Sequence, residues 1–321
     1  MTSSPNTERS PQALLETMML IRALEERNAA RQAEGKAAGT CTSVGQEASA
    51  VGVIRALEAR DLILTNHRSA GHLIARGADC GRIMAEIAGK QTGYCKGKSG
   101  TLHISVKELG VILTSTIVGG ELSLATGVGL SVSMLGTGAV VACFFGDGAA
   151  CEGVFHESLN LAAVWNLPIL YVCENNQWQA YVQRRETMLI EQIATRAASY
   201  GMPGKTVDGN DVEAVLAAAT EAVSTIRQTS KPFLLETYTY RTRGHFEPDD
   251  QSYVNPEELA AWKAKDPILA MERRLLDRGT VKQADIEAMR ARVQKQIDQA
   301  AAFATDSPYP TPEQVTTEVY A

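Results

Sequence analysis

The sequence predicts one α/β fold, a doubly wound parallel sheet flanked by helices, with helical additions at both ends. Two almost wholly apolar runs, residues 140–145 and 168–173, enclose a helix-like segment, which is typical of parallel strands buried on both faces. The alternation continues with an alanine-rich helical segment at residues 211–228 and a strand-like run at residues 233–239. Crossovers between parallel strands are right-handed in nearly all proteins, so these segments indicate helices layered against a parallel sheet.

The composition and charge of the chain exclude several classes of protein. Of its 321 residues, 45% are hydrophobic and 21% are charged, as in most soluble globular domains. The net charge of −6 argues against nucleic acid or an anionic membrane surface as the main partner. No apolar run approaches the length of about 18 residues that a membrane span requires. The polar start MTSSPNTERSPQ lacks the apolar core of a secretory signal, so we expect a cytoplasmic protein without nucleic-acid or membrane partners.

The first third of the chain predicts two helices and a short strand. Residues 1–10 are expected to be disordered, and Ser10, which precedes a proline, is the predicted N-cap of a helix over residues 11–33. A second helix is predicted over residues 46–59 and a strand over residues 62–65. The glycine- and lysine-rich segment 89–103 is predicted to be a loop.

The rest of the chain completes one domain, which we expect to span residues 11–321. Helices are predicted over residues 122–135 and 152–165, and after a polar loop the chain is predicted to be helical to about residue 304. Residues 256–321 form a helical C-terminal extension and tail in this prediction. The apolar face of the 152–165 helix is assigned to Val154, Ser158, Leu161 and Trp165, which share helical spacing.

Polar side chains follow two of the predicted strands at their carboxyl ends. Asp147 stands in GDG directly after the first strand, and Glu174, Asn175 and Asn176 follow the second in CENNQW. Ligands of parallel sheets bind at this edge, and neighbouring strands lie about 4.8 Å apart. A carboxylate and an amide oxygen can therefore meet on one cation, and magnesium prefers such oxygen ligands together with phosphate.

The residues around GDG suit a diphosphate group. The helix that begins near Glu152 directs its free N–H groups and positive dipole end at this position. Gly146 and Gly148 allow the backbone to approach a phosphate closely. GDG alone is more often only a tight turn, but the asparagine pair in the expected place about 30 residues later favours a magnesium-bridged diphosphate site.

GDG followed by NN at this separation resembles the motif of thiamine diphosphate enzymes. The segments VGQEASAVG, TNHRSAGH, GKSGTLHI, STIVGG, GDGAACEG, ENNQW, YRTRGHFEPDD and TPEQVTTEVYA are similar, in this order, to those of one group within them. That group is the alpha subunit of the decarboxylating component of 2-oxo acid dehydrogenase complexes, and the chain is most similar to its pyruvate and acetoin dehydrogenase branches. The resemblance covers nearly the whole chain from residue 11 onward and implies the thiamine diphosphate-binding fold.

The resemblance also implies which residues hold the metal and the diphosphate. Magnesium ligands are expected from the side chains of Asp147 and Asn176 and from the backbone carbonyl of Trp178. Arg68 matches an arginine that binds diphosphate oxygens, and guanidinium groups suit this task. His67 occupies the place of a neighbouring tyrosine and is likewise an implied cofactor-binding residue. Backbone contacts to the diphosphate are expected from Gly146, Gly148 and Ala149.

Further residues are implied to hold the cofactor ring and to act in catalysis. Backbone groups of Val118 are expected to bind the aminopyrimidine ring. Thr116, which stands where a glycine is common in the family, is also an implied cofactor-binding residue. His245, in RGHF, matches the histidine that faces the reactive carbon of the cofactor. Its implied role is proton transfer or stabilisation of an anionic intermediate.

Two positions on the implied substrate side depart from the family pattern. Cys41 and Ala70 stand where the pyruvate and acetoin branches commonly have histidines. A thiol and a methyl group offer fewer hydrogen bonds and more apolar room than two imidazoles. We therefore expect a small carbonyl substrate that is larger or less polar than pyruvate; neutral drift in a pyruvate enzyme is the alternative.

The implied function is that of a thiamine diphosphate-dependent 2-oxo acid or acetoin dehydrogenase subunit. A cofactor ylid attacks the carbonyl substrate, which is cleaved, and the acyl group passes on, normally to a lipoyl arm. The family takes a required glutamate from a beta subunit, so an α2β2 heterotetramer is expected, with a lipoyl-bearing acyltransferase core as a further partner. A carboligase of the same family and a non-catalytic assembly subunit remain open alternatives.

Overall fold

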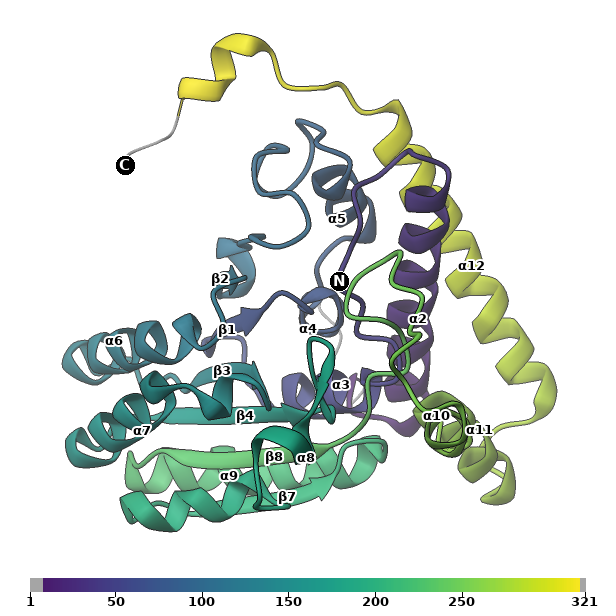
Figure 1. The fold of residues 1–321 in the computed structure, drawn as a ribbon. Coiled ribbons are helices and arrows are strands. Elements are labelled where there is room, and N and C mark those ends of the chain that lie inside the picture. The colour runs from purple at the N-terminus through teal and green to yellow at the C-terminus, as the bar shows by residue number, and fades with distance from the viewer. Residues whose placement is uncertain (1–7, 318–321) are drawn as a thin grey trace.

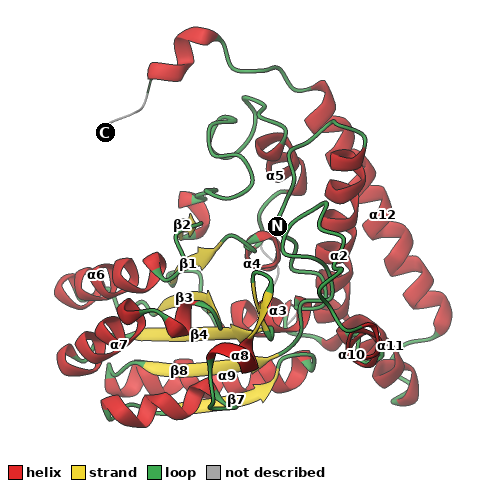
Figure 2. Cartoon of the chain, in the orientation of Figure 1, coloured by secondary structure: helices red, strands yellow, loops and turns green. Residues whose placement is uncertain are grey.

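The structure is a computed structural model that describes residues 8–317, except for the side chain of residue 315, so residues 1–7 of the predicted disordered segment and residues 318–321 lie outside it. Six parallel strands form one sheet in the order β2-β1-β3-β4-β8-β7 (Figures 1 and 2). The strands are β1 (Leu62–Asn66), β2 (Val111–Ser115), β3 (Val141–Gly146), β4 (Ile169–Asn175), β7 (Gly204–Asp208) and β8 (Phe233–Tyr238). The predicted α/β class and the parallel sheet are confirmed.

Helices cover the sheet and extend the fold at its C-terminal end. They are α2 (Pro11–Ala33), α3 (Glu47–Ala56), α4 (Ala70–Arg76), α5 (Cys80–Ile87), α6 (Gly120–Leu135), α7 (Gly153–Trp165), α8 (Arg184–Thr187), α9 (Val212–Thr229), α10 (Pro256–Lys263), α11 (Pro267–Asp277) and α12 (Gln283–Asp306). A small antiparallel hairpin is formed by β5 (Trp178–Gln179) and β6 (Val182–Gln183). No helix between residues 8 and 317 is long and apolar enough to cross a membrane.

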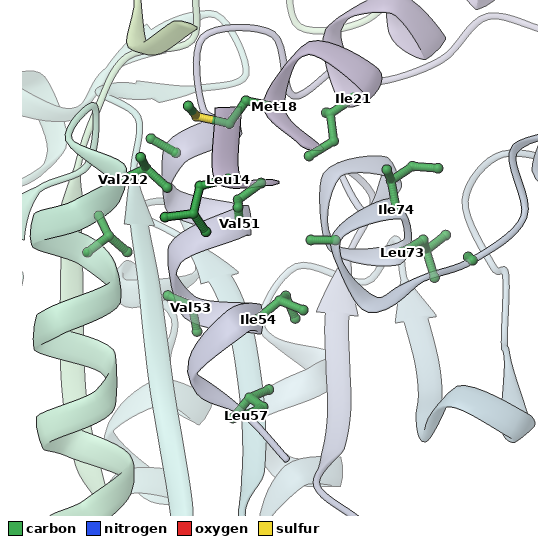
Figure 3. Close-up of a cluster of buried hydrophobic side chains, with 14 of the residues drawn as sticks. Leu14, Met18, Ile21, Val51, Val53, Ile54, Leu57, Leu73, Ile74 and Val212 are labelled. Atoms are coloured by element: carbon green, nitrogen blue, oxygen red, sulfur yellow. The ribbon is translucent and has the colours of Figure 1, made fainter. Parts of the chain in front are cut away.

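The core lies in two layers, one on each face of the sheet. Alternate side chains of β3 point to opposite faces: Phe144 joins the cluster that includes residues of α2, α3 and α9, whereas Phe145 joins the cluster that includes α6 and α7. Figure 3 shows part of the first cluster, in which Leu14 and Met18 of α2 lie near Val51 of α3. Because successive side chains of a strand face opposite layers and both layers are buried, these strands are almost continuously apolar.

Most predicted elements are confirmed within a few residues of their ends. Helix α2 has the predicted bounds, and the hydroxyl of Ser10 accepts a hydrogen bond from the N–H of Ala13 at 3.3 Å. Helix α3 ends three residues earlier than predicted, at Ala56, because Leu57 is already extended. The two strands at the sheet edges, β2 and β7, and the short helices α4 and α5 were not predicted.

The predicted apolar face of α7 is wrong. The residues that α7 buries are Phe155, Ser158, Leu159 and Ala162, so only Ser158 belongs to the predicted set. Leu161 and Trp165 are 39% and 48% exposed, because they lie on the outer side of the helix. Apolar residues occur on both sides of α7, and spacing alone therefore could not distinguish its core side.

Candidate functional site

A cleft of about 310 Å³ opens at the carboxyl ends of β1, β3 and β4. Strands β3 and β4 are neighbours in parallel register, and Gly146 pairs with Glu174. The two strand ends therefore bring Asp147 and Asn176 into the walls of the same cleft, as the sequence predicts. Of the other predicted residues, His67, Arg68, Val118, Gly146, Gly148, Ala149, Trp178 and His245 also line it.

Asp147 is a buried carboxylate with an unused oxygen. Only 1% of the residue is exposed. One oxygen, Oδ1, accepts a hydrogen bond from the N–H of Gly148 at 3.1 Å, and Oδ2 has no partner among residues 8–317. Burial raises the pKa of Asp147 to about 7, since removal from water disfavours the charged form. A cation in the cleft would offset this cost.

Asn176 is oriented by a residue that the sequence did not single out. Its Nδ2 donates to Oε1 of Gln46 at 3.1 Å, and its Oδ1 accepts from the backbone N–H of Trp178 at 3.1 Å. Gln46 is the N-cap residue of α3 and lines the cleft. In the sequence, only the position of Gln46 inside the VGQEASAVG segment indicates that it could contact the site and orient Asn176.

The oxygen atoms of Asp147 and Asn176 are of the kind that magnesium binds. No three His, Cys, Asp or Glu side chains within residues 8–317 are arranged to hold a metal ion. The predicted set does not require such a group, because it consists of one carboxylate, one amide and one backbone carbonyl. A site of this kind relies on phosphate oxygens to complete the metal shell.

The two glycines of GDG leave space beside the backbone. A Cβ atom on Gly146 would meet no atom within 4 Å, and one on Gly148 would only touch the side chain of Gln179 at 3.5 Å. Neither glycine has the left-handed φ that demands glycine. The small residues therefore serve to keep the cleft wall open, which agrees with a bulky ligand at this position.

Arg68 joins the cleft to the loop that carries His245. Its guanidinium donates to the backbone carbonyls of Thr42 and of His245, both at 2.8 Å. The second of these nitrogens also lies 3.2 Å from Nδ1 of His245. Burial lowers the pKa of Arg68, and an arginine nonetheless remains charged.

Neighbouring residues order the loop around His245. The backbone N–H of His245 and the hydroxyl of Tyr253 both donate to Oδ2 of Asp249. Arg241, which is 1% exposed, donates to the hydroxyl of Tyr253 and to the carbonyl of Ala180. Burial, followed by the positive charge of Arg68, lowers the pKa of His245 to about 4. The imidazole is therefore neutral near pH 7.

Three predicted residues lie outside the cleft wall. The hydroxyl of Thr116 lies 3.4 Å from Nε2 of His103, and Thr116 is absent from the lining of the cleft. Cys41 and Ala70 line a separate inner cavity of about 20 Å³, which has His67 in common with the cleft. The structure thus places the two substrate-side positions behind His67.

Two further carboxylates of the cleft were given no role by the sequence. Glu174 accepts hydrogen bonds from Oγ of Ser49 at 3.0 Å and from Nε2 of His72 at 3.1 Å. Glu121, in the first turn of α6, is 2% exposed and has one oxygen without a partner in the described chain. Burial raises the pKa of Glu121 to about 7.

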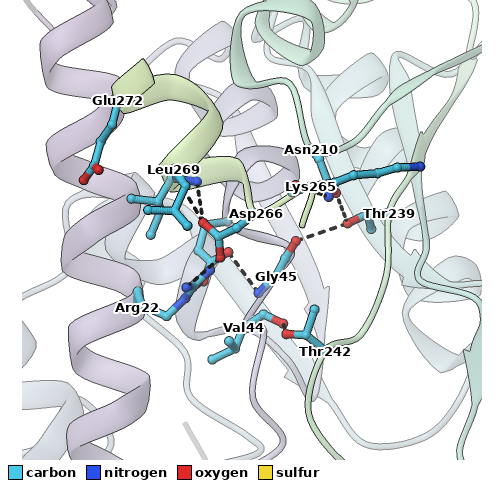
Figure 4. A network of polar contacts seen from close by, with 12 residues as sticks. Arg22, Val44, Gly45, Asn210, Thr239, Thr242, Lys265, Asp266, Leu269 and Glu272 are labelled. Carbon is cyan, nitrogen blue, oxygen red and sulfur yellow. Dashed lines mark hydrogen bonds and ion pairs between the residues drawn. The ribbon is translucent and has the colours of Figure 1, made fainter. Parts of the chain in front are cut away.

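A larger cavity of about 530 Å³ is lined by part of the 242–251 loop and by residues of α10 and α11. Figure 4 shows its polar network, in which Arg22 bonds to Asp266 at 2.9 Å and Thr239 bonds to Asn210 at 2.7 Å. Arg243 is likewise paired with Glu247 at 2.7 Å. The carboxylates of Asp266 and Glu247 are already paired within the fold, whereas Oδ2 of Asp147 is not, so the smaller cleft is the better candidate.

Comparison with known proteins shows the family of the chain. The profile of the family described as "Dehydrogenase E1 component" matches residues 16–313. The alpha subunit of acetoin:2,6-dichlorophenolindophenol oxidoreductase from Bacillus subtilis is 43% identical over 317 residues, which cover 98% of this chain and 94% of that protein. The alpha subunit of the pyruvate dehydrogenase E1 component from Rhizobium meliloti is 36% identical over 304 residues, 94% of this chain and 87% of that protein. The chain belongs to the dehydrogenase E1 component family, whose cofactor is thiamine diphosphate, and it matches the alpha subunits of that family.

Proposed function

We propose that the chain is the alpha subunit of a thiamine diphosphate- and magnesium-dependent dehydrogenase that acts on a neutral acyloin or diketone. The single observation that supports this most strongly is the free Oδ2 of Asp147 in the wall of the cleft. When bound, thiamine diphosphate supplies a nucleophilic carbon and a ring that accepts electrons. The residues of this chain bind it, orient it and move protons beside it.

Asp147 and Asn176 are the proposed side-chain ligands of magnesium. The structural support is that their oxygens stand at the ends of two adjacent strands, and that one carboxylate oxygen has no partner in the described residues. The carbonyl of Trp178 is the proposed third protein ligand. Magnesium usually takes only one or two carboxylates and leaves the remaining positions to phosphate and water.

Arg68 and the start of α7 are proposed to hold the diphosphate. The side chain of Arg68 has five N–H donors, and its contacts with Thr42 and His245 leave donors for phosphate oxygens. The N-cap residue of α7, Glu152, makes no side-chain capping bond to the first turn. In that turn the N–H of Phe155 donates to the carbonyl of Glu152, which leaves the N–H groups of Gly153 and Val154 for an anion.

His245 is proposed to hold or transfer a proton at the substrate oxygen. Because a guanidinium nitrogen can only donate, its approach to Nδ1 makes that atom the acceptor. The neutral ring then carries its proton on Nε2. This N–H can donate to the oxygen of a substrate carbonyl and support the charge that develops there.

The polar groups of the cleft favour a neutral substrate. Both His67 and His245 have pKa values well below neutrality, about 3 and about 4, so they offer hydrogen bonds rather than positive charges. The donors of Arg68 that its contacts with Thr42 and His245 leave over are proposed to bind the diphosphate rather than the substrate. A 2-oxo acid would bring a carboxylate without a dedicated cation, whereas an acyloin brings only hydroxyl and carbonyl oxygens.

A beta subunit is the proposed partner, with a lipoyl-bearing core as a further one. Helices α6 and α7 pack together and expose apolar side chains, which we call the α6–α7 surface: Leu124, Leu130, Met134, Leu135, Leu161, Val164 and Trp165. Such a surface is typical of a chain that functions in an assembly. The named relatives are likewise alpha subunits.

The proposed function is tested with the chain and its beta subunit, magnesium, thiamine diphosphate and dichlorophenolindophenol as electron acceptor. Turnover is measured with acetoin, longer α-diketones, pyruvate and branched 2-oxo acids. We expect kcat/KM to be highest for a neutral compound. A clear preference for pyruvate over every bulkier or neutral compound would contradict the proposed substrate, and absence of all turnover despite cofactor binding would contradict the proposed enzyme.

A further inference from the structure

His67 separates the cleft from the inner cavity. It follows Asn66, the last residue of β1, and it lines both the cleft of about 310 Å³ and the inner cavity of about 20 Å³. Its ring centroid lies 6.0 Å from that of His245, with the two rings edge to face. The two imidazoles therefore stand side by side at the same end of the cleft.

His67 differs from the other histidines in its hydrogen bonding. The chain has five histidines, all within the described residues. Four of them have a polar partner: His72 lies 3.1 Å from Glu174, His103 3.4 Å from Thr116, His156 2.5 Å from Tyr200 and His245 3.2 Å from Arg68. His67 has only ring contacts within residues 8–317. Its two ring nitrogens are therefore available to something outside the chain.

The charge state of His67 suits recognition of an uncharged oxygen. Burial and the nearby positive charge of Arg68 lower its pKa to about 3. The ring is neutral over the physiological range, so one nitrogen donates and the other accepts. Such a ring binds a hydroxyl or carbonyl oxygen without the desolvation cost of an added charge.

A water in the inner cavity could orient the ring of His67 from the side opposite the cleft. The cavity has room for about one water-sized group. The amide of Asn28 and the hydroxyl of Thr40, both on its wall, have no hydrogen-bond partner in the described chain. A water that bonds one of these groups and one nitrogen of His67 would leave the other nitrogen for the cleft.

We propose that His67 is a specificity-determining residue that hydrogen-bonds the second oxygen of a vicinal hydroxy-ketone or diketone, while His245 serves the reacting carbonyl. The proposal rests on the proposed function, because it assigns the substrate of that same cleft. The ring centroids lie 6.0 Å apart, which is short enough for one small molecule to contact both imidazoles. A monofunctional carbonyl compound would leave His67 without a partner.

The test compares His67→Phe, His67→Gln and the matched control His156→Gln, each assembled with the beta subunit. Two quantities are measured: the Kd of thiamine diphosphate with magnesium by calorimetry, and kcat and KM for acetoin and pyruvate at saturating cofactor. We expect His67→Phe to lower kcat/KM for acetoin about 10- to 100-fold, the cost of a lost hydrogen bond to a buried group, mainly through KM. The cofactor Kd should change by less than about threefold, which is under 1 kcal/mol. His67→Gln should keep part of the activity, because the amide also donates and accepts.

Other outcomes separate failure of this proposal from failure of the proposed function. If His67→Phe weakens cofactor binding and saturating cofactor restores kcat/KM, His67 is a cofactor residue and the proposal is overturned. Unchanged kinetics in both variants also overturn it. If the unaltered enzyme prefers pyruvate, the proposed substrate fails, and a selective loss of kcat/KM for pyruvate in His67→Phe would still support a substrate contact.

Discussion

The guanidinium of Arg68 donates to the backbone carbonyl of His245 at 2.8 Å and lies 3.2 Å from its Nδ1. The two residues are 177 positions apart in the sequence. Arg68 is the proposed diphosphate ligand and His245 the proposed proton donor, so one side chain connects cofactor binding to the orientation of the imidazole. Changes at Arg68 should therefore affect both properties together.

Replacement of Arg68 by lysine should weaken cofactor binding about 10-fold and also lower kcat. A lysine keeps the charge but cannot donate in fixed directions to Thr42, His245 and a phosphate at once. Calorimetry with thiamine diphosphate and steady-state kinetics of the assembled enzyme measure the two effects. The control is Arg60→Lys, a change at an exposed residue paired with Glu58. An unchanged kcat at saturating cofactor would argue against the coupling.

Loss of the imidazole in His245→Ala should lower kcat by about 10²- to 10⁴-fold, the usual range for a positioned proton-transfer group. Cofactor affinity should change little, because Arg68 contacts the backbone carbonyl of His245, which alanine retains. His156→Ala, at an exposed histidine of α7, is the control and should keep full activity. If kcat fell by less than about fivefold in His245→Ala, His245 would not be the proton-transfer group.

The buried carboxyl of Glu121 predicts a pH dependence of stability in the cofactor-free chain. Burial raises its pKa from 4.5 to about 7, so between these values the folded chain keeps a proton that the unfolded chain releases. The contribution of Glu121 to the free energy of unfolding is therefore most favourable below about pH 4.5, and it is lost as the pH rises from there through 7.

The corresponding variant is Glu121→Gln, which has no titrating proton. The fall in the free energy of unfolding between pH 5 and pH 8 should be about 2 kcal/mol smaller in this variant than in the unaltered chain. Urea unfolding at both pH values measures it, with Glu157→Gln, at an exposed position of α7, as the control. Equal pH dependence in all three proteins would show that Glu121 is ionised in the folded state.

A charge on the α6–α7 surface should weaken assembly with the beta subunit. Met134 is 79% exposed, so Met134→Asp should leave the isolated chain folded while placing an unpaired charge in an apolar interface. Light scattering after size-exclusion chromatography measures the assembly. Leu269→Asp, a change at an exposed position of α11, is the control. Normal assembly of Met134→Asp would locate the interface elsewhere.

The sequence predicted the central strands well because their signal is local. Strands β3, β4 and β8 are mainly apolar and are buried on both faces, and polar residues at the ends of β3 and β4 mark their carboxyl ends. The edge strand β7 reads GKTVD, and its residues are exposed or half-buried. An edge strand without an apolar run gives no periodic signal, and it becomes a strand only by pairing with β8.

The site was predictable where a motif carries its chemistry within a few residues. Asp147 and Asn176 follow from GDG, NN and the parallel order of their strands. Gln46 is different, because its role depends on contact with Asn176, 130 positions away in the sequence. The buried state of Glu121 likewise depends on packing against the sheet, and a glutamate in the first turn of a helix usually indicates only a favourable charge at the helix dipole.

The proposed metal–diphosphate site is tested most directly by calorimetric titration of thiamine diphosphate into the assembled enzyme. The titration is made with and without magnesium, for the unaltered chain and for Asp147→Asn. The change removes the negative charge and keeps the shape of the side chain. A charge-assisted contact of about 1.5–3 kcal/mol corresponds to a 10- to 100-fold change in affinity. We expect magnesium to strengthen binding in the unaltered enzyme and to have a much smaller effect in Asp147→Asn. Equal magnesium dependence in both proteins would contradict the assignment of Asp147, and with it the proposed metal–diphosphate site.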